Sequence, residues 1–327
     1  MAKVLGIGNA LVDLLISLKN DELLAELHLP KGSMTLVDEN TKNHIDRLSK
    51  GLKREMASGG SAANTIHGLA RLGVESAFIG KIGQDEIGGV FQNDLEKSGI
   101  EPLLYKSNSA SGLASAMISP DGERTFGTYL GAAVELSGSD LKPGHFVGYS
   151  ILHVEGYLVQ NHDLLENIMK QASAAGLAIS LDLASYNVVE ANLDFLKSMA
   201  EKYVSLIFAN EEEAKAFTGK EPAEALDEIA KIAKIAVVKT GKKGSLVKSG
   251  KNVFEIPTFT VNAIDTTGAG DLYASGFIYG IINDLPLDKA GQIGTILAST
   301  VIENIGAKIP DKDWPALKEK IKSISLL

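Results

Sequence analysis

The chain of 327 residues is the size of one large domain with an embellishment, and 45% hydrophobic with 22% charged residues is typical of a folded globular protein. Its net charge of −9 argues against a nucleic-acid partner. The lack of cysteine excludes disulfides, thiolate catalysis and cysteine-ligated zinc. Because no apolar run is long enough to span a membrane and the first residues lack the apolar core of a signal peptide, we expect a cytoplasmic protein with no membrane partner.

The first half of the chain is expected to be rich in short strands. After an opening strand at residues 4–7, strand-like segments with little helix lie at 33–37, 101–106, 113–119 and 124–130. The turn sequence Pro120-Asp121-Gly122 predicts a hairpin between the last two segments. We expect these pieces to form a small β-rich lid drawn from discontinuous segments within 14–40 and 101–131.

The second half alternates between short apolar strands and amphipathic helices. Strands are expected at 151–154, 177–181, 204–209 and 235–239, and helices at 162–175, 190–201, 211–217, 222–234, 269–283, 288–304 and 313–324. Buried strands separated by helices predict a mostly parallel sheet covered on both faces, which is an α/β fold with a three-layer α/β/α core. Because no repeat or Pro-rich linker interrupts the sequence, we expect a single domain over residues 1–327.

The most informative segment is DTTGAGD, residues 265–271, which opens a predicted apolar helix. Gly268, Ala269 and Gly270 would let a ligand approach free backbone N–H groups at the positive end of the helix dipole, which is an anion hole. Asp271 would lie in the first turn, stay ionised there and accept a proton from a hydroxyl group. A loop followed by an ordinary helix-stabilising aspartate explains these residues equally well.

A second segment, GGSAAN at residues 59–64, opens an amphipathic helix. Gly59 and Gly60 permit an unusual turn, and Asn64 offers a donor and an acceptor to a hydroxylated ligand. The simpler alternative is a helix capped by Ser61 with Asn64 exposed. Upstream, Asp13 interrupts an apolar run, where a carboxylate is costly unless it is hydrogen-bonded. Sugar hydroxyls are suitable donors, whereas a loop that leaves this carboxylate in water is the alternative.

Two further patterns concern nucleotides. Asn210 and Glu213 follow a predicted strand and satisfy a capping box, and the same pair is suited to holding water-bound Mg²⁺ beside phosphates. No G-x-x-x-x-G-K-[ST] sequence occurs, which excludes a Walker-type NTPase. The segment from Gly6 to Leu11 begins like a dinucleotide fingerprint but has Leu11 in place of the third glycine, which weakens the dehydrogenase interpretation.

Together, the two glycine-containing segments resemble the two signatures of the PfkB, or ribokinase-like, carbohydrate and nucleoside kinases. The early signature continues to residues 78–83, and the late one is DTTGAGD, about 200 residues further on. Asn210 and Glu213 lie between them, as the Asn-x-x-Glu of that family does. Each signature alone is moderately specific, and both in this order are much more so. The resemblance covers nearly the whole chain.

The resemblance implies ATP-dependent phosphotransfer and a role for each matching residue. Asp271 would be the general base, and Gly268, Ala269 and Gly270 would form the anion hole. The residues implied in acceptor binding are Asp13, Gly59, Gly60, Asn64 and Arg124. The residues implied in nucleotide binding are Asn210, Thr240, Gly241, Gly244 and Asn304. Glu213 would hold Mg²⁺ through water, and Asp265 and Thr267 would lie near a monovalent cation, K⁺, as in ribokinases.

Within the family, residues 31–38, 121–125 and 153–157 resemble the bacterial adenosine-kinase-like branch, so adenosine is the expected acceptor and AMP the product. The lid residues Met34, Leu36, Phe126 and Tyr129 would form an apolar wall for the base, although the lid's own core is an equally good use for them. A ribokinase- or fructokinase-type sugar kinase and a non-catalytic ligand-sensing protein on a kinase fold are the alternatives. A homodimer through the lid is also expected.

Overall fold

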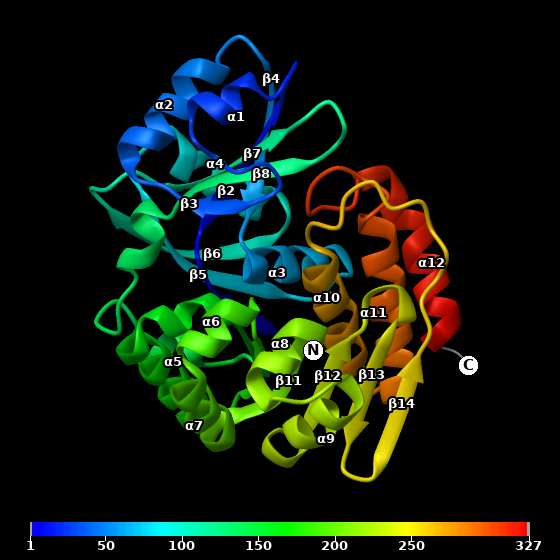
Figure 1. The fold of residues 1–327 in the computed structure, drawn as a ribbon. Helices are drawn as coiled ribbons and strands as arrows, with labels where there is room; N and C mark the ends of the chain where they lie inside the picture. The colour runs from blue at the N-terminus through cyan, green and yellow to red at the C-terminus, as the bar shows by residue number, and fades with distance from the viewer. Residues whose placement is uncertain (1, 326–327) are drawn as a thin grey trace.

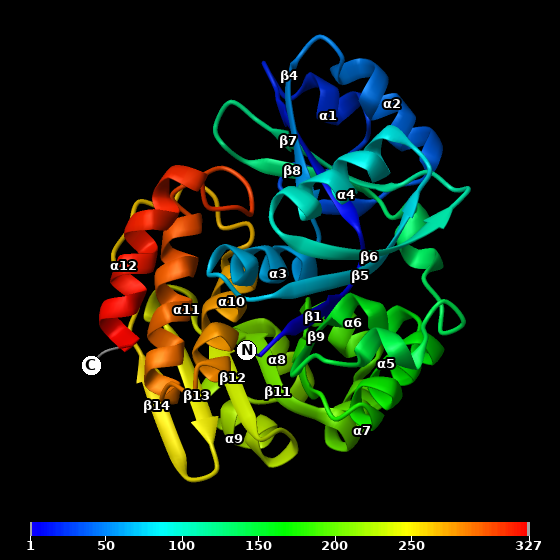
Figure 2. The ribbon, with the colours of Figure 1, turned by 180° about the vertical axis from the view of Figure 1, so that it is seen from behind.

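The computed structural model describes residues 2–325, and its core is a nine-stranded sheet (Figures 1 and 2). In spatial order the strands are β14 (Asn252–Ile256), β13 (Ser245–Ser249), β12 (Ile235–Lys239), β11 (Val204–Asn210), β10 (Ala178–Asp182), β9 (Ile151–Glu155), β1 (Val4–Ile7), β5 (Ser76–Gly83) and β6 (Ile100–Ser107). All pairs from β12 to β6 are parallel, and β13 and β14 are antiparallel.

Helices cover both faces of this sheet, which confirms the predicted three-layer α/β/α core. One face packs against α5 (His162–Ala174), α6 (Tyr186–Ala191), α7 (Leu193–Tyr203), α8 (Glu211–Thr218) and α9 (Pro222–Ile232). The other packs against α3 (Ser61–Arg71), α10 (Ala269–Ile282) and α11 (Leu287–Val301), with α12 (Trp314–Ser325) outside them. The central strands are apolar because both of their faces are buried. Among the described residues, no helix has both the length and the apolar character needed to cross a membrane.

A second, five-stranded sheet stands beyond the carboxyl ends of the large sheet's parallel strands (Figure 1). Its strands, in spatial order, are β3 (Met34–Leu36), β8 (Arg124–Tyr129), β7 (Gly112–Ile118), β2 (Leu11–Ser17) and β4 (Lys53–Gly59). One face buries Val12, Leu14 and Ile16 against α2 (Glu39–Ser49) and α4 (Glu86–Lys97), with α1 (Glu22–Glu26) beside them. The hairpin predicted at Pro120-Asp121-Gly122 joins β7 to β8. We call this sheet and its helices the lid.

The predicted boundaries of the lid need three corrections. The segment at 101–106 is β6, which pairs with β5 at one edge of the large sheet. The lid instead gains β4, which was not predicted, and it begins with β2 at Leu11 rather than at residue 14. Both misassigned strands lie at sheet edges, where one side of the strand is exposed and the hydrophobic pattern is weak.

Smaller differences concern the second half of the chain. The helix expected at 190–201 is two helices, α6 and α7, and the hairpin of β13 and β14 was not predicted. The helix expected to end at 304 ends at Val301, so Asn304 lies in the turn that follows it. The helices and strands predicted between 151 and 239 otherwise match the structure to within a few residues.

Candidate active site

Polar side chains gather at the carboxyl edge of the large sheet, where parallel strands of an α/β fold usually bind their ligands. Glu155, Asp182 and Lys239 are the last residues of β9, β10 and β12. Buried Glu155 accepts hydrogen bonds from the Asn9 side chain (2.8 Å) and from the backbone N–H of Ala62 (3.2 Å). Burial raises the pKa of Glu155 to about 7. This carboxyl group therefore fixes the start of α3 against the sheet.

The two glycine-containing segments meet at Asp271. Its carboxylate accepts hydrogen bonds from Ser61 Oγ (2.7 Å) and from Asn64 Nδ2 (2.9 Å). Asn64 is buried, with 5% of its surface exposed, so the alternative of an exposed Asn64 is wrong. Gly60, with φ = 89°, caps α3 in place of Ser61. A Cβ at Gly60 would collide with the carbonyl oxygen of Asn9, which explains the glycine there.

Asp271 lies in the first turn of α10, which begins at Ala269 after Gly268 in a left-handed conformation with φ = 75°. The N–H of Ala269 donates to Thr266 O (3.2 Å), whereas those of Gly268 and Gly270 have no acceptor among the described residues and can bind an anion. Burial raises the pKa of Asp271 to about 6, although the hydrogen bonds from Asn64 and Ser61 favour its charged form. The site thus places a carboxylate that can take up a proton beside a group of anion-binding N–H donors.

Asp13 lies on the face of the lid sheet that is not covered by helices. No donor among residues 2–325 makes a hydrogen bond to its carboxylate, and a Cβ at Gly59 would collide with that carboxylate. Burial raises the pKa of Asp13 to about 7, which Lys308 opposes and Asp271 reinforces. Asn64 Oδ1 is also buried without a partner among the described residues. Two polar acceptors near Asp271 are therefore free to bind donors from a ligand.

Arg124 reaches from lid strand β8 to the late glycine-containing segment. Its guanidinium NH1 lies 2.7 Å from Asp265 Oδ2 and 3.3 Å from Thr267 Oγ1. Asp265 also accepts from Gly306 N (2.6 Å), and from the N–H (3.1 Å) and hydroxyl (2.7 Å) of Thr267. Because the guanidinium already occupies this carboxylate, a monovalent cation does not fit the Asp265 and Thr267 side chains as they lie. The Arg124 guanidinium therefore occupies the place where K⁺ was expected.

A second charged group lies on the nucleotide side of the predicted site. Lys239 Nζ is 3.0 Å from Asp182 Oδ2. Asn210 and Glu213 form the predicted capping box, in which the Asn210 backbone N–H (2.8 Å) and Nδ2 (2.7 Å) both donate to the Glu213 carboxylate. Burial and the neighbouring Asp182 raise the pKa of Glu213 to about 7. Neither Asp182 nor the side chain of Lys239 was predicted from the sequence.

Of the remaining predicted nucleotide residues, three lie on the same edge, directly after β12. Thr240, Gly241 and Gly244 form a tight turn after β12, closed by a hydrogen bond from Thr240 N to Gly244 O (2.8 Å). Gly241 (φ = 54°) and Gly244 (φ = 101°) adopt backbone conformations that favour glycine. Asn304 Nδ2 donates to Thr300 O (3.0 Å), so its side chain faces its own helix end.

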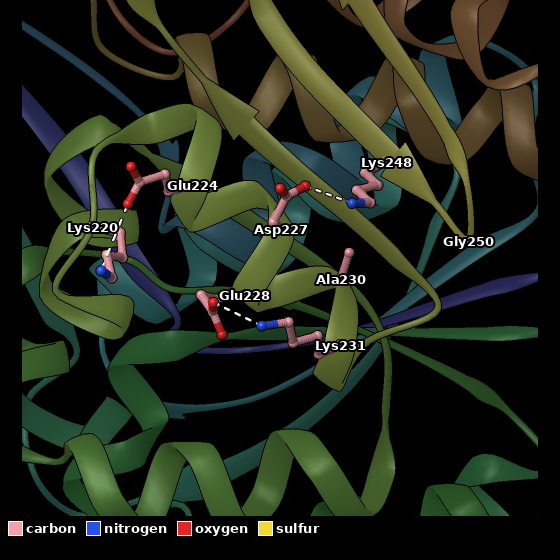
Figure 3. Close-up of a pocket in the computed structure, with 8 residues that line it drawn as sticks. All are labelled: Lys220, Glu224, Asp227, Glu228, Ala230, Lys231, Lys248 and Gly250. Atoms are coloured by element: carbon pink, nitrogen blue, oxygen red, sulfur yellow. Dashed lines mark hydrogen bonds and ion pairs between the residues drawn. The ribbon is translucent and has the colours of Figure 1, made fainter.

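Two surface hollows differ in their relation to this site. Figure 3 shows one between α9 and β13, where Lys248 pairs with Asp227 and Lys231 with Glu228. Lys248 lies opposite Ala236, at the amino end of β12, so this hollow is on the far edge of the sheet. The other has a volume of about 430 Å³ and adjoins the site through Asn9. Its wall includes Val134, Tyr157 and Leu158.

Comparisons with known proteins show the family of the chain. Residues 32–314 match the profile of the pfkB family of carbohydrate kinases. The chain belongs to this family. As a pfkB-family protein it is a phosphotransferase, a kinase for a sugar or nucleoside, and the ligand-sensing alternative is set aside.

Three relatives of this pfkB-family chain illustrate the range of acceptors. A probable sugar kinase from Rhizobium etli is similar in structure, with a TM-score of 0.88 and 30% identity over 100% of this chain and 99% of that one. The adenosine kinase from Sinorhizobium meliloti has a TM-score of 0.86 and 30% identity over 98% and 99% of the two chains. A 5-dehydro-2-deoxygluconokinase from Geobacillus kaustophilus is 31% identical over 75% of this chain and 79% of its own length.

Proposed function

We propose that this protein transfers the γ-phosphoryl group of ATP to a primary hydroxyl of a nucleoside, with adenosine as acceptor and AMP as product. The observation that supports it most is the position of Asp271, between the Ser61 and Asn64 side chains and the first N–H groups of α10. A base beside an anion hole is what in-line phosphoryl transfer to a hydroxyl requires.

In this proposal each polar group has one task. Asp13 and Asn64 Oδ1 accept hydrogen bonds from acceptor hydroxyls, which satisfies two acceptors that lack donors among the described residues. Asp271 takes the proton of the attacking hydroxyl, and the N–H groups of Gly268, Ala269 and Gly270 bind the transferring phosphoryl group. Arg124, held at Asp265, adds positive charge from the lid and helps to exclude water when the lid covers the site.

The nucleotide would lie along the carboxyl edge of β11 and β12. Asn210 and the turn containing Thr240, Gly241 and Gly244 lie at the ends of these neighbouring strands, with Asn304 as a further contact. Mg²⁺ usually keeps several waters and binds few protein carboxylates when phosphates supply other ligands. Buried, acidic Glu213 fits such a water-mediated contact, and the ion would neutralise phosphate charge.

The arrangement of the lid sheet favours a nucleoside over a free sugar as the phosphoryl acceptor. One row of paired residues crosses the lid sheet. Asp13 pairs with Ala114, Ala114 pairs with Thr128, and Thr128 pairs with Leu36. Leu36 therefore lies on the same face of the sheet as Asp13. Three strand spacings are about 14 Å, which is longer than a sugar ring. Leu36 is 55% exposed, and Met34 and Phe126 lie in the adjacent row of the same face.

Tyr129 lies on the other, helix-covered face of the lid sheet, where the Lys42 ammonium lies over its ring. The apolar wall proposed for the base therefore consists of Met34, Leu36 and Phe126 without Tyr129. The 430 Å³ hollow beside Asn9 has a mixed wall, in which Tyr157 and Leu158 stand beside polar residues such as Gln160 and Asp163, so it adds no continuous apolar surface. Similarity to the adenosine kinase from Sinorhizobium meliloti is consistent with this acceptor.

We expect kcat/KM to be higher for adenosine than for ribose, fructose or 5-dehydro-2-deoxygluconate at fixed ATP and Mg²⁺. A Leu36→Ser variant should lose efficiency with adenosine and keep its efficiency with ribose, because only the base contacts the apolar wall. A coupled ADP-release assay measures both. If a sugar exceeds adenosine tenfold or more, the acceptor is a sugar and the nucleoside proposal is wrong, while the kinase assignment stands.

The homodimer expected through the lid remains a prediction. Helices α2 and α4 cover one face of the lid sheet, and the other carries Asp13 and Arg124. A second copy would have to bind the outer surface of these helices, an edge of the sheet, or the face over the candidate site.

A further inference from the structure

The ammonium of Lys239 lies inside the candidate site, and no role proposed for the other residues involves it. Lys239 ends β12, and its side chain is 16% exposed. A Cβ placed on Gly270 would lie 2.9 Å from Nζ. The lysine therefore contacts the first turn of α10, at the position where a side chain on residue 270 would begin.

One carboxylate, Asp182, pairs with this ammonium. Burial opposes its charge, but Asp182 and the negative charges of Glu213 and Asp271 hold the pKa of Lys239 above its ordinary value. An ammonium has three N–H donors. Among residues 2–325, Asp182 accepts a hydrogen bond from one of them. Asp182 Oδ1 accepts from the backbone N–H of Ala184 (3.0 Å), so Asp182 is itself fixed. Lys239 is thus positively charged and held in place, with donors left for a ligand.

A simpler explanation is that Lys239 only neutralises buried Asp182, since a buried carboxylate needs a partner. That role requires contact with Asp182 alone. It does not require the ammonium to touch the first turn of α10, beside the N–H groups of Gly268, Ala269 and Gly270. The lack of a side chain on Gly270 gives the ammonium access to the space in front of these groups.

We propose that Lys239 is a further catalytic residue, whose ammonium binds the transferring phosphoryl group together with the N–H groups of Gly268, Ala269 and Gly270. Lysine is a common ligand of phosphate in nucleotide-binding proteins, where it acts as a point charge. The inference rests on the proposed function, which brings the γ-phosphate to this helix end. The bond from the acceptor oxygen to phosphorus forms, the bond from phosphorus to the ADP oxygen breaks, and Asp271 receives the hydroxyl proton. Lys239 keeps its protons and neutralises charge.

The absence of cysteine from the chain allows a sharp test. A Lys239→Cys variant has a single thiol, which 2-bromoethylamine converts to a thioether analogue of lysine with the ammonium restored. Iodoacetamide, applied to the same variant, adds a neutral group of similar size as the matched control. Mass spectrometry confirms one adduct per chain, and the melting temperature confirms folding.

The unmodified variant is expected to lose about 10²-fold in kcat, the scale seen when one preorganised donor is removed from a charge-stabilising site. Aminoethylation should restore kcat to within tenfold of wild type, the iodoacetamide adduct should stay low, and the acceptor KM should change less than threefold throughout. A kcat within threefold of wild type before modification, or equal recovery with both reagents, would overturn the proposal.

A second variant covers the case in which the single substitution does not fold. In Lys239→Met/Asp182→Asn both members of the buried ion pair are replaced by uncharged side chains. If Lys239 only neutralises Asp182, this double variant should turn over at the wild-type rate, which would contradict the proposal. We expect it to fold and to remain about 10²-fold slow. If wild type itself phosphorylates none of the acceptors, the proposed function fails instead, so the two failures are distinguishable.

Discussion

Replacing Asp271 with asparagine is expected to lower kcat by about 10² to 10⁴-fold while leaving ATP binding nearly unchanged, because a positioned base contributes about this much. The amide cannot take up the hydroxyl proton. Its oxygen can still accept from Asn64 or Ser61, which lie within 2.9 Å of the two carboxylate oxygens. The start of α10 should therefore keep its geometry. Single-turnover kinetics and calorimetry with ATP measure the two quantities.

The matched control is Asp288→Asn, because Asp288 also lies in the first turn of a helix, α11, outside the candidate site. This variant should keep wild-type kcat, so helix-dipole effects alone do not account for the loss. If Asp271→Asn retains more than a tenth of wild-type turnover, Asp271 is not the base.

Replacing Asp13 with alanine should weaken acceptor binding by about 1.5 to 3 kcal/mol, or roughly ten- to 150-fold, because a hydrogen bond to a charged group contributes this much. The carboxylate has no donor among the described residues, so we expect ligand hydroxyls to be its partners. Stability should change little or increase, since burial already disfavours the charged form of Asp13 and raises its pKa to about 7. Isothermal calorimetry with the acceptor measures the affinity.

Glu55→Ala serves as the control for Asp13. Glu55 lies on the adjacent lid strand β4, opposite Leu15, and forms an exposed ion pair with Lys53 (2.9 Å). Its loss should not change acceptor affinity, because exposed ion pairs contribute little. Unchanged affinity in Asp13→Ala on folded protein would place Asp13 outside the acceptor pocket.

The sequence predicts the large sheet well where its strands are buried on both faces. β9, β10, β11 and β12 are mostly apolar and are separated by amphipathic helices, a pattern typical of a parallel sheet that is covered on both faces. The edge strands were harder to place. β6 and β4 mix charged with apolar residues because one side of each is free, so nothing in their local sequence says which sheet they join.

The candidate site was predictable in its motifs but not in its long-range pairs. The approach of Asn64 to Asp271 follows from the packing of α3 on α10, and the motifs alone left an exposed Asn64 as an alternative. The pair of Lys239 and Asp182 is separated by 57 positions, and neither residue belongs to a local motif that predicts the other. One signal was present: both are charged residues that end apolar strands, at the edge where ligands bind.

The two signatures meet at Asp271, where the late one supplies the base and the early one supplies Asn64. The pH dependence of single-turnover phosphoryl transfer tests this most directly. Because the base must be ionised, the rate should rise with pH through about 6, the pKa of Asp271, and then level off. Asn64 donates to the charged form and lowers this pKa, so Asn64→Leu should move the half-maximal pH upward. Asn283→Leu, at the other end of α10, should leave it in place. A profile without an acid limb, or one that Asn64→Leu does not move, would contradict the account.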